Sequence, residues 1–481
     1  QSIAREYISE SDRFIDVSIR KPIDKSSPAI QKDDSKCIKC QRCVRTCEEL
    51  QHVGALSMAH KGDKANVETF LDLPIDDVVC TNCGQCVNRC PTGALTERHY
   101  IDEVWEALAD PKKHVVVQTA PAVRVALGEA LGFEPGKSVT GQMVTALRRM
   151  GFDKVFDTNF TADLTIIEEG NELLKRLKTA LKDKGKVALP MMTSCSPGWI
   201  KYIEHEFPTL LDNLSTCKSP QQMFGAVAKT YYAQKADINP ANMIVVSVMP
   251  CTAKKFEAAR DEMNSSEYQD VDYVITTREL ALMIQQAGID FPSLEETAAD
   301  SILGEHTGAG VIFGATGGVM EAALRTAYEV ITGREVPFKN LEITPVRGMD
   351  GVKEASIKIE GCLPEWSFLN GAELKLAIAH GLTNARTLMK EIEKGTANYH
   401  FIEIMACPGG CLGGGGQPIP TNLEIRKKRM EAIYEEDRGM ALRKSHDNPE
   451  VKRLYEEFLK EPLGHKSHDL LHTHYKKRQK Y

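Results

Sequence analysis

The stretch FIEIMACPGGCLGGGGQP, residues Phe401 to Pro418, is the starting point for interpreting the whole chain. Its apolar opening, Phe401 to Met405, predicts a strand. The strand continues into a loop that carries Cys407 and Cys411 among glycines, which let the backbone approach a bulky ligand closely. Two thiolates on such a loop indicate an iron–sulfur cofactor. A flexible Gly-rich turn with incidental cysteines is the alternative.

The composition is that of an ordinary globular protein. The chain has 481 residues, of which 42% are hydrophobic and 26% charged, so it has room for about two to four domains. No apolar run approaches the ~20 residues that span a bilayer, and no signal-peptide pattern opens the sequence, so we expect a cytoplasmic protein without a membrane span. The formal net charge of -7 gives no reason to expect nucleic acid, whose binders concentrate positive charge.

Fourteen cysteines are many for a chain without a secretory signal, where cysteine clusters more often bind metal or do redox chemistry. Their spacing is therefore the informative feature. Residues 1–30 are polar and contain Pro22 and Pro28, which predicts an entry segment or linker. The first residue is Gln1 rather than Met, which leaves room for further domains in front of it.

Two identical CxxCxxCxxxC runs mark the next segment, residues 31–110. This is the pattern of two-cluster bacterial ferredoxins, in which three thiolates of one run and the fourth of the other hold each [4Fe–4S] cube. The expected ligand sets are Cys37, Cys40, Cys43 and Cys90 for one cube, and Cys80, Cys83, Cys86 and Cys47 for the other. Zinc is the alternative, but zinc sites do not need a third cysteine at the next +3 position. Glu48 stands where a proline would follow the first run, which loses a rigid turn but no ligand.

Residues 111–420 alternate short apolar runs with helical patterns, which predicts an α/β domain. The predicted strands are Val115–Val117, Val187–Met192, Met243–Val248, Val311–Phe313 and Phe401–Met405. Each is followed by an unusual loop, and in open α/β sheets ligands bind beyond the carboxyl ends of the strands. Loops distant in sequence can therefore meet around one object. The loop after Val311–Phe313, Gly314 to Gly318, leads into an amphipathic helix that ends near Ile331.

Residues 421–481 are highly charged and predict helices at Arg426–Glu436 and Pro449–Leu459. The segment ends in a histidine-rich tail with His465, His468, His472 and His474. Cysteines or carboxylates do not stand at obvious ligand spacing from these histidines. We therefore expect a solvated or packed tail that wraps the main domain, with metal binding as the alternative.

Six cysteines remain after the two ferredoxin runs. Those on the predicted strand-end loops are Cys195, Cys251, Cys407 and Cys411, of which the first three stand beside a proline or one residue from it. Three such loops with four sulfurs would suit a third iron–sulfur centre. Cys217 and Cys362 do not lie on these loops and are expected to be buried thiols.

The loops TSCSPGW, MPCTAKKFE and EIMACPGGCLGGGGQP resemble the three active-site signatures of the [FeFe]-hydrogenases, and the resemblance extends over nearly the whole chain. The paired cysteine runs resemble the accessory-cluster domain of that family, and the C-terminal helices resemble a segment that is a separate small subunit in some members. The resemblance implies an α+β arrangement. A ferredoxin-like two-cluster domain precedes an α/β H-cluster domain built of two open-sheet lobes, and a helical C-terminal wrap follows.

The resemblance also implies an H-cluster, a [4Fe–4S] cube joined through a cysteine sulfur to a two-iron unit with CO, cyanide and a bridging dithiolate amine. Cys251, Cys407 and Cys411 match cube ligands, and Cys411 matches the thiolate that bridges to the two-iron unit. Cys195 matches the cysteine that passes protons to the amine. Lys254 matches a lysine hydrogen-bonded to a cyanide.

Further positions match the surroundings of that cofactor. The outward proton route of the family corresponds here to Glu169, Ser215, Glu172 and Arg176. Positions around the cofactor correspond to Ser219, Gln221, Met249, Glu257, Phe313 and Met405. Without the resemblance, Glu169 and Glu172 would be interpreted as a solvated helix face. Lys254 and Glu257 could likewise be a surface i,i+3 pair.

Ser196 is the departure from the family pattern, because the family carries a second cysteine there as the fourth cube ligand. A hydroxyl is a weaker acid than a thiol and a harder ligand for iron. Four explanations for Ser196 stay open: alkoxide ligation, an open iron site, a shifted loop that makes Cys195 the ligand, and an introduced substitution.

The leading hypothesis is a hydrogenase that interconverts dihydrogen with protons and electrons and passes the electrons through two cubes to ferredoxin or a redox subunit. In this family the two-iron unit also requires maturation proteins. The alternatives are an iron–sulfur assembly or scaffold protein and a sensory hydrogenase-like protein. Cys195, Lys254 and Glu257 favour the enzyme, whereas Ser196 leaves room for the scaffold.

Overall fold

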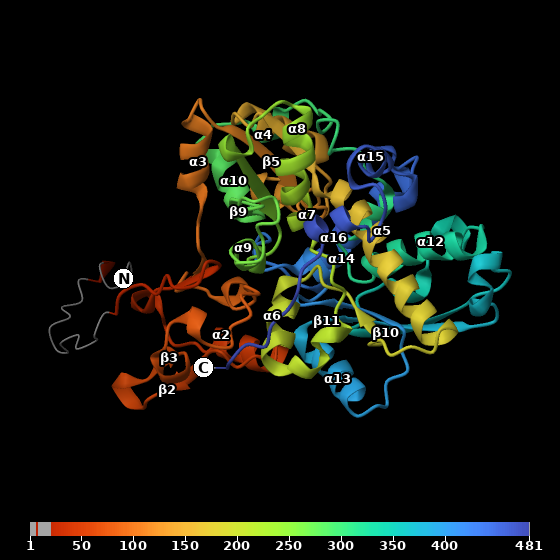
Figure 1. The fold of residues 1–481 in the computed structure, drawn as a ribbon. Helices are drawn as coiled ribbons and strands as arrows, with labels where there is room; N and C mark the ends of the chain where they lie inside the picture. The colour runs from red at the N-terminus through yellow and green to blue at the C-terminus, as the bar shows by residue number, and fades with distance from the viewer. Residues whose placement is uncertain (1–5, 8–20, 481) are drawn as a thin grey trace.

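The computed structural model describes residues 6–7 and 21–480 and has a small cysteine-rich part beside a larger α/β part (Figure 1). The small part, in red and orange, contains two antiparallel strand pairs. These pairs are β1 (Ile30–Lys32) with β4 (Leu95–Glu97), and β2 (Ser57–Ala59) with β3 (Asn66–Glu68). Helix α3 (Ile101–Ala109) leads from them into the larger part.

The first lobe of the larger part is a four-stranded, wholly parallel sheet. Its strand order is β6 (Lys154–Asp157), β5 (His114–Thr119), β8 (Met243–Met249) and β9 (Tyr273–Thr276). The central strands are buried along almost their whole length, which explains their unbroken Val and Ile runs. The predicted strands at 115–117 and 243–248 lie within β5 and β8.

The second lobe is a mixed four-stranded sheet. Its order is β10 (Val352–Lys358), β11 (Glu373–His380), β12 (Phe401–Met405) and β7 (Met191–Met192), and only β10 runs antiparallel to its neighbour. Strand β12 has the predicted bounds and is buried on both faces. Its charged residue, Glu403, accepts hydrogen bonds from the amides of Gly317 (2.6 Å) and Met320 (2.8 Å) at the start of helix α12 (Gly318–Thr332). A buried carboxylate is stabilised there by the helix N-terminus.

One predicted strand was wrong, and another was longer than the strand in the structure. Val311 and Ile312 form the end of helix α11 (Gly308–Ile312) and Phe313 is its C-cap, while the Thr307 hydroxyl caps its first turn. A short apolar run does not distinguish a buried strand from a buried helix. The predicted strand 187–192 is reduced to Met191–Met192, because Pro190 has no amide to give to the sheet.

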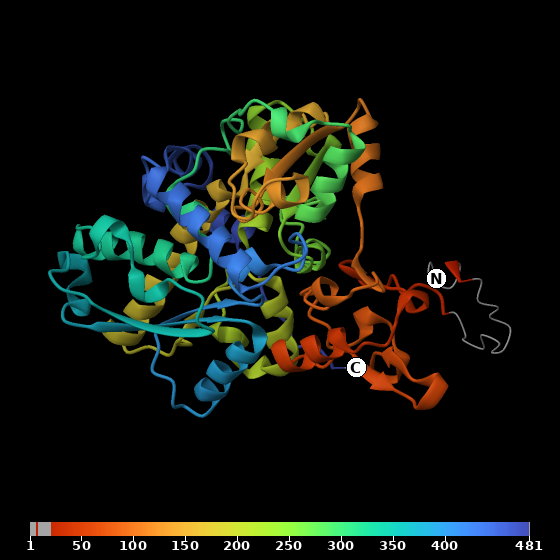
Figure 2. The same ribbon diagram turned by 180° about the vertical axis from the view of Figure 1, so that it is seen from behind.

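Helix α5 (Thr158–Leu177) joins the two lobes, since it packs against α7 (Pro220–Val227) of the first lobe and against α11 and α12 of the second. Figure 1 shows it as the long yellow helix that crosses the molecule. The predicted C-terminal wrap is confirmed. Its helices are α14 (Leu423–Gly439), α15 (Pro449–Leu454) and α16 (His465–Leu471). Figure 2 shows the blue α14 lying across the back of the molecule between the lobes.

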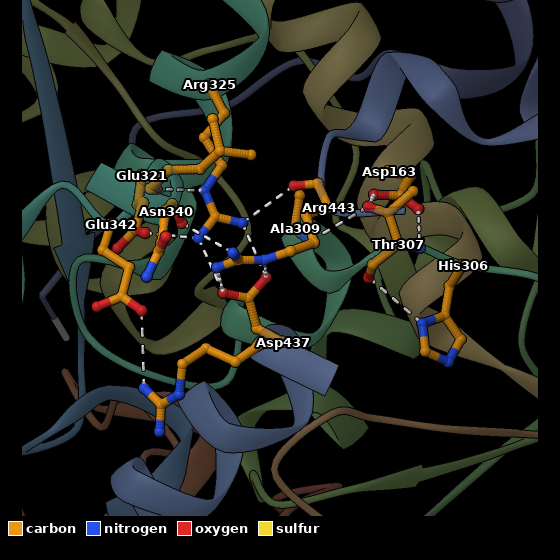
Figure 3. Close-up of polar contacts among 12 residues, drawn as sticks. Asp163, His306, Thr307, Ala309, Glu321, Arg325, Asn340, Glu342, Asp437 and Arg443 are labelled. Atoms are coloured by element: carbon orange, nitrogen blue, oxygen red, sulfur yellow. Dashed lines mark hydrogen bonds and ion pairs between the residues drawn. The ribbon is translucent and has the colours of Figure 1, made fainter. Parts of the chain in front are cut away.

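A buried ion network fastens α14 to the second lobe (Figure 3). Arg325 of α12 donates to both carboxylate oxygens of Asp437 at 2.9 Å and to Glu321 at 2.6 Å, and all three side chains are fully buried. Arg443 donates to the same Asp437 carboxylate. Because each buried charge is paired, the network holds the wrap in one position.

Replacing Arg325 by Met leaves Asp437 and Glu321 buried with less compensation. We expect this change to lower the free energy of unfolding by about 3–5 kcal/mol, as when a buried pair is broken from one side. Urea denaturation followed by circular dichroism measures it. The control is Lys358→Met, which removes an exposed pair with Glu360 and should leave the midpoint unchanged. Equal midpoints for the two variants would contradict this role of the network.

Candidate functional site

Loops at the carboxyl ends of β8 and β12 enclose an apolar cavity of about 770 Å³, including the space that opens toward solvent. Most of the predicted cofactor residues line it. These are Cys195, Ser196, Gln221, Met249, Cys251, Lys254, Phe313, Met405, Cys407 and Cys411. Cysteines from three loops distant in sequence therefore face one space.

Glycines allow the two main cysteine loops to come this close. Gly409 and Gly410 adopt φ values of 79° and 77° between Cys407 and Cys411, a region that other residues rarely adopt. A Cβ on Gly414 would lie 2.0 Å from the carbonyl oxygen of Pro250, the residue before Cys251. The Gly-rich segment is therefore needed for close approach.

Lys254 and Glu257 form a buried pair beside the cavity, so the surface-pair alternative is wrong. The Lys254 ammonium donates to Glu257 Oε2 at 2.8 Å and to the Cys195 carbonyl at 3.0 Å. Glu257 also accepts from Ser219 at 2.8 Å and from the Gln221 amide at 3.1 Å. An ammonium has three N–H donors, so Lys254 keeps one for a group in the cavity.

Cys195 and Ser196 are neighbours in the chain with different surroundings. The charges that act on the Cys195 thiol include those of Glu169, Lys254 and Cys411, and burial raises the pKa of this thiol well above its usual value. The Ser196 hydroxyl instead accepts a hydrogen bond from the amide of Ala406 at 3.1 Å. Ser196 therefore lies on the Cys407 side of the cavity.

Glu169 and Glu172 are buried on α5, so the solvated-face alternative is also wrong. Burial, with the negative charge of Glu172, raises the pKa of Glu169 to about 8, although the Ser215 hydroxyl favours its charged form. Ser215 donates to Glu172 at 3.0 Å, and Arg176 donates to Glu172 at 2.6 Å. These groups line up from the neighbourhood of Cys195 toward the Arg176 end of the helix.

The histidine tail is partly buried against this line of groups. His465 is exposed, whereas His472 is buried and contacts Glu168 at 3.2 Å. Ligand atoms of His472, Cys217 and Glu172 lie within 4.8 Å of one another. The sequence did not reveal this cluster, because its members are far apart along the chain. The expectation of a packed tail holds for His472 and that of a solvated tail for His465.

The ferredoxin-type cysteines line two separate cavities. Cys37, Cys40, Cys43 and Cys90 line one, and Cys47, Cys80, Cys83 and Cys86 line the other. These are the two sets expected from the spacing. Cys217 is buried as expected, but Cys362 is only half-buried.

Cys83 also lines the large cavity, a position that the sequence did not reveal. Gln51 bridges the two sites, since its side-chain amide lies 3.6 Å from Cys83 Sγ and donates to the Ala406 carbonyl at 3.0 Å. The second ferredoxin-type site therefore adjoins the large cavity directly.

Arg426 of α14 is a second residue that sequence reasoning missed. Its side chain lies against the loop that carries the two cysteines, 3.2 Å from a Cβ built on Gly409. Its buried Nε has no hydrogen-bond partner among the described residues. Burial and the cations Arg89 and Arg429 lower the pKa of Arg426, whereas a negative Cys407 would raise it. Arg426 is half-buried and has no ion pair among the described residues, so an anion in the adjacent site would gain a nearby cation.

Three family models match the chain. The model for the iron only hydrogenase large subunit, C-terminal domain, matches residues 113–415. The iron hydrogenase small subunit model matches residues 423–478, and the ferredoxin-like domain of NADH-quinone oxidoreductase subunit 3 matches residues 27–96. In the described part of the chain, no helix combines the length and apolar character that a membrane crossing requires.

Known proteins of this kind are similar over most of the chain. The NADP-reducing hydrogenase subunit HndD of Solidesulfovibrio fructosivorans is 55% identical over 94% of this chain and 76% of its own length. Iron hydrogenase 1 of Clostridium pasteurianum is 43% identical over 95% of this chain and 77% of its own length. Protein NAR1 of Arabidopsis thaliana is 34% identical over 82% of this chain and 84% of its own length. A solved structure of [FeFe]-hydrogenase HydA1 from Chlamydomonas reinhardtii aligns with a TM-score of 0.71 and 46% identity, over 79% of this chain and all of that one.

We expect the Glu169 carboxyl to be neutral at about pH 6 and to lose its proton near pH 8, because burial and Glu172 disfavour the carboxylate. In infrared spectra its carboxylic C=O band should disappear with that midpoint and be absent from Glu169→Gln. The folded chain then holds a proton that the unfolded chain releases, so the free energy of unfolding should fall as the pH rises from about 4.5 to about 8. A variant spectrum identical to that of the wild type would contradict this assignment.

Arg426→Gln should lower the reduction potential of a cluster held by Cys407. Removing a nearby cation disfavours the reduced, more negative cluster, by on the order of 50 mV for one charge at partly screened distance. Redox titration followed by electron paramagnetic resonance (EPR) measures the shift. Lys427→Gln, at the exposed next position of α14, is the control. Identical potentials in both variants would refute the role of Arg426.

Proposed function

The chain belongs to the family of iron-only, or [FeFe], hydrogenases, and from this premise we propose that it catalyses the reversible interconversion of dihydrogen with protons and electrons at an H-cluster. The supporting observation is that Cys251, Cys407 and Cys411 converge on one apolar cavity beside the buried Lys254. A plain electron carrier needs neither such a cavity nor a buried line of carboxyl groups leading from it.

The residues around the cavity fit this cofactor. Thiolates are the ligands that iron–sulfur clusters prefer, and burial raises the pKa of Cys251 to about 12, so cluster binding would displace its proton. The free N–H of Lys254 and the cation of Arg426 would compensate negative charge on the cofactor. Met249, Phe313 and Met405 supply apolar walls. When bound, the H-cluster supplies the metal chemistry that cleaves or forms dihydrogen.

The protein's own part in the reaction is to move protons and to position groups. We assign Cys195 as the group that exchanges a proton with the cofactor, since it lines the cavity and lies near enough to Glu169 for the carboxylate to raise the pKa of its buried thiol. A carboxyl group with a pKa of about 8 can both accept and release a proton near neutral pH, which suits Glu169. Ser215, Glu172 and Arg176 continue the line outward.

Electrons would travel through the ferredoxin-type sites. We propose that Cys83 and its three partner cysteines hold the inner cube, since Cys83 lines both cavities. Cys37, Cys40, Cys43 and Cys90 would hold the outer cube, where Cys40 is exposed and accessible to a redox partner. Ferredoxin or a redox subunit in the cytoplasm is the proposed partner, and maturation proteins would supply the two-iron unit.

Iron–sulfur assembly is the second candidate function. Ser196 favours it, because a scaffold does not need four strong ligands on its cube. Infrared spectra of the chain expressed with hydrogenase maturation proteins distinguish the two functions. Bands of CO and cyanide together with dihydrogen turnover support the hydrogenase, and absence of both supports the scaffold.

Cys195→Ala should retain the CO and cyanide bands but lose about 100-fold or more of its dihydrogen evolution, the usual effect of removing a proton-transfer group. Cys362→Ala removes a thiol that lines none of the cysteine cavities and is the matched control. Dihydrogen evolution with reduced methyl viologen measures both. Wild-type turnover in Cys195→Ala would exclude the assigned role.

A further inference from the structure

Three sulfurs and one hydroxyl face the large cavity at the positions that the family signatures associate with the cube. Ser196 lines the same cavity as Cys251, Cys407 and Cys411. Its Oγ is held 3.1 Å from the amide of Ala406, which directly precedes Cys407 in the chain. The hydroxyl therefore belongs to the cube side of the cavity.

The Ser196 loop is fixed in this position. The Ser196 carbonyl accepts hydrogen bonds from the backbone amides of Trp199 and Ile200, both at 3.0 Å, at the start of helix α6 (Pro197–Glu206). A Cβ on Gly198 would lie 3.1 Å from Ala406 Cβ, so this first turn packs closely against the β12 loop. A one-residue slip that brought Cys195 to the cube would break these contacts.

Cys195 has its own surroundings, which also oppose a slip. Lys254 binds the Cys195 carbonyl at 3.0 Å, and the Ser194 hydroxyl donates to the Cys217 carbonyl at 2.7 Å. The groups whose charge affects the Cys195 thiol are Glu169, Lys254 and Glu403, together with Cys411 of the β12 loop. The geometry therefore leaves Ser196, and not Cys195, on the Cys407 side of the cavity, where it would face a cube held by Cys251, Cys407 and Cys411.

We propose that Ser196 gives this protein a site-differentiated cube, in which the fourth iron is an exchangeable ferrous site. This inference shares one premise with the proposed function, namely that a cube occupies the cavity. A neutral or alkoxide oxygen is a poorer ligand for cluster iron than a thiolate. One-electron oxidation of a [4Fe–4S]²⁺ cube by an added oxidant gives [4Fe–4S]³⁺, which then releases Fe²⁺ and leaves [3Fe–4S]⁺. The charges balance, and the reverse step needs one electron and one Fe²⁺.

The test uses the full chain with its clusters assembled by iron and sulfide in the absence of maturation proteins. Ferricyanide is the oxidant, and EPR of the [3Fe–4S]⁺ cluster measures the rate of iron loss. Ser196→Cys restores a thiol at the fourth iron and should lose iron at least tenfold more slowly than the wild type. Ser356→Cys, which adds a thiol at an exposed position, should behave like the wild type.

A second readout identifies the exchanging iron. After oxidation, ⁵⁷Fe²⁺ and dithionite should rebuild the cube in the wild type, and Mössbauer spectra should show the label at a single iron site. Equal rates of iron loss in the wild type and in Ser196→Cys would overturn the proposal, as would label spread over several sites. Because no two-iron unit is present, these results do not depend on dihydrogen turnover, and a failed activity assay would leave them unchanged.

Discussion

The site depends on a close backbone contact between loops from two different sheets. The Gly416 amide donates to the Pro250 carbonyl at 2.9 Å, and Gly414 passes so near the same carbonyl that a side chain would not fit. The Gln417 side chain adds a hydrogen bond to the Ala122 carbonyl of the first lobe at 3.0 Å. Because β8 and β12 belong to separate lobes, this contact brings Cys251 to the Cys407 and Cys411 pair. The long glycine run is therefore a requirement of packing as well as of ligand access.

Buried charge around this contact is arranged unequally. Away from the cavity, most buried cations of the described residues are paired with a carboxylate, as in the contact of Lys255 with Glu279 at 2.8 Å. Beside the cavity, and counting only partners in the described part of the chain, Lys254 keeps one free donor and Arg426 has an unpaired Nε. Lys254 is already paired with Glu257 and Arg426 is half-buried, so an anionic cofactor would complete the hydrogen bonding of these two cations rather than neutralise isolated buried charges. The protein therefore has a local charge pattern that complements a negative cluster.

Much of this could be predicted from sequence, for reasons of spacing. The ferredoxin runs and the strand-end cysteines are local patterns, and the structure groups them as the spacing indicated. The helix at Val311 was missed because three apolar residues carry no usable periodicity. Arg426 was missed because its place depends on how the C-terminal helix docks. The position of Cys83 between two cavities was missed because it depends on how the ferredoxin-like part docks. Burial of Glu169 depends likewise on packing between the lobes, although its position on α5 is local.

The arrangement also separates the proposed paths of protons and electrons. Protons would leave along α5, which joins the lobes, whereas electrons would enter through Cys83 in the small N-terminal part. Both proposed paths end at the same cavity, so an electron that arrived there would make the negative charge beside Cys195 larger and would favour the protonated forms of the nearby thiol and carboxyl groups. Because their pKa values are raised, Cys195 and Glu169 each hold a proton near neutral pH that can pass toward the cavity and be replaced from the outer groups. Electrostatic coupling across the cavity can therefore link the two transfers while their carriers stay on different elements of the fold.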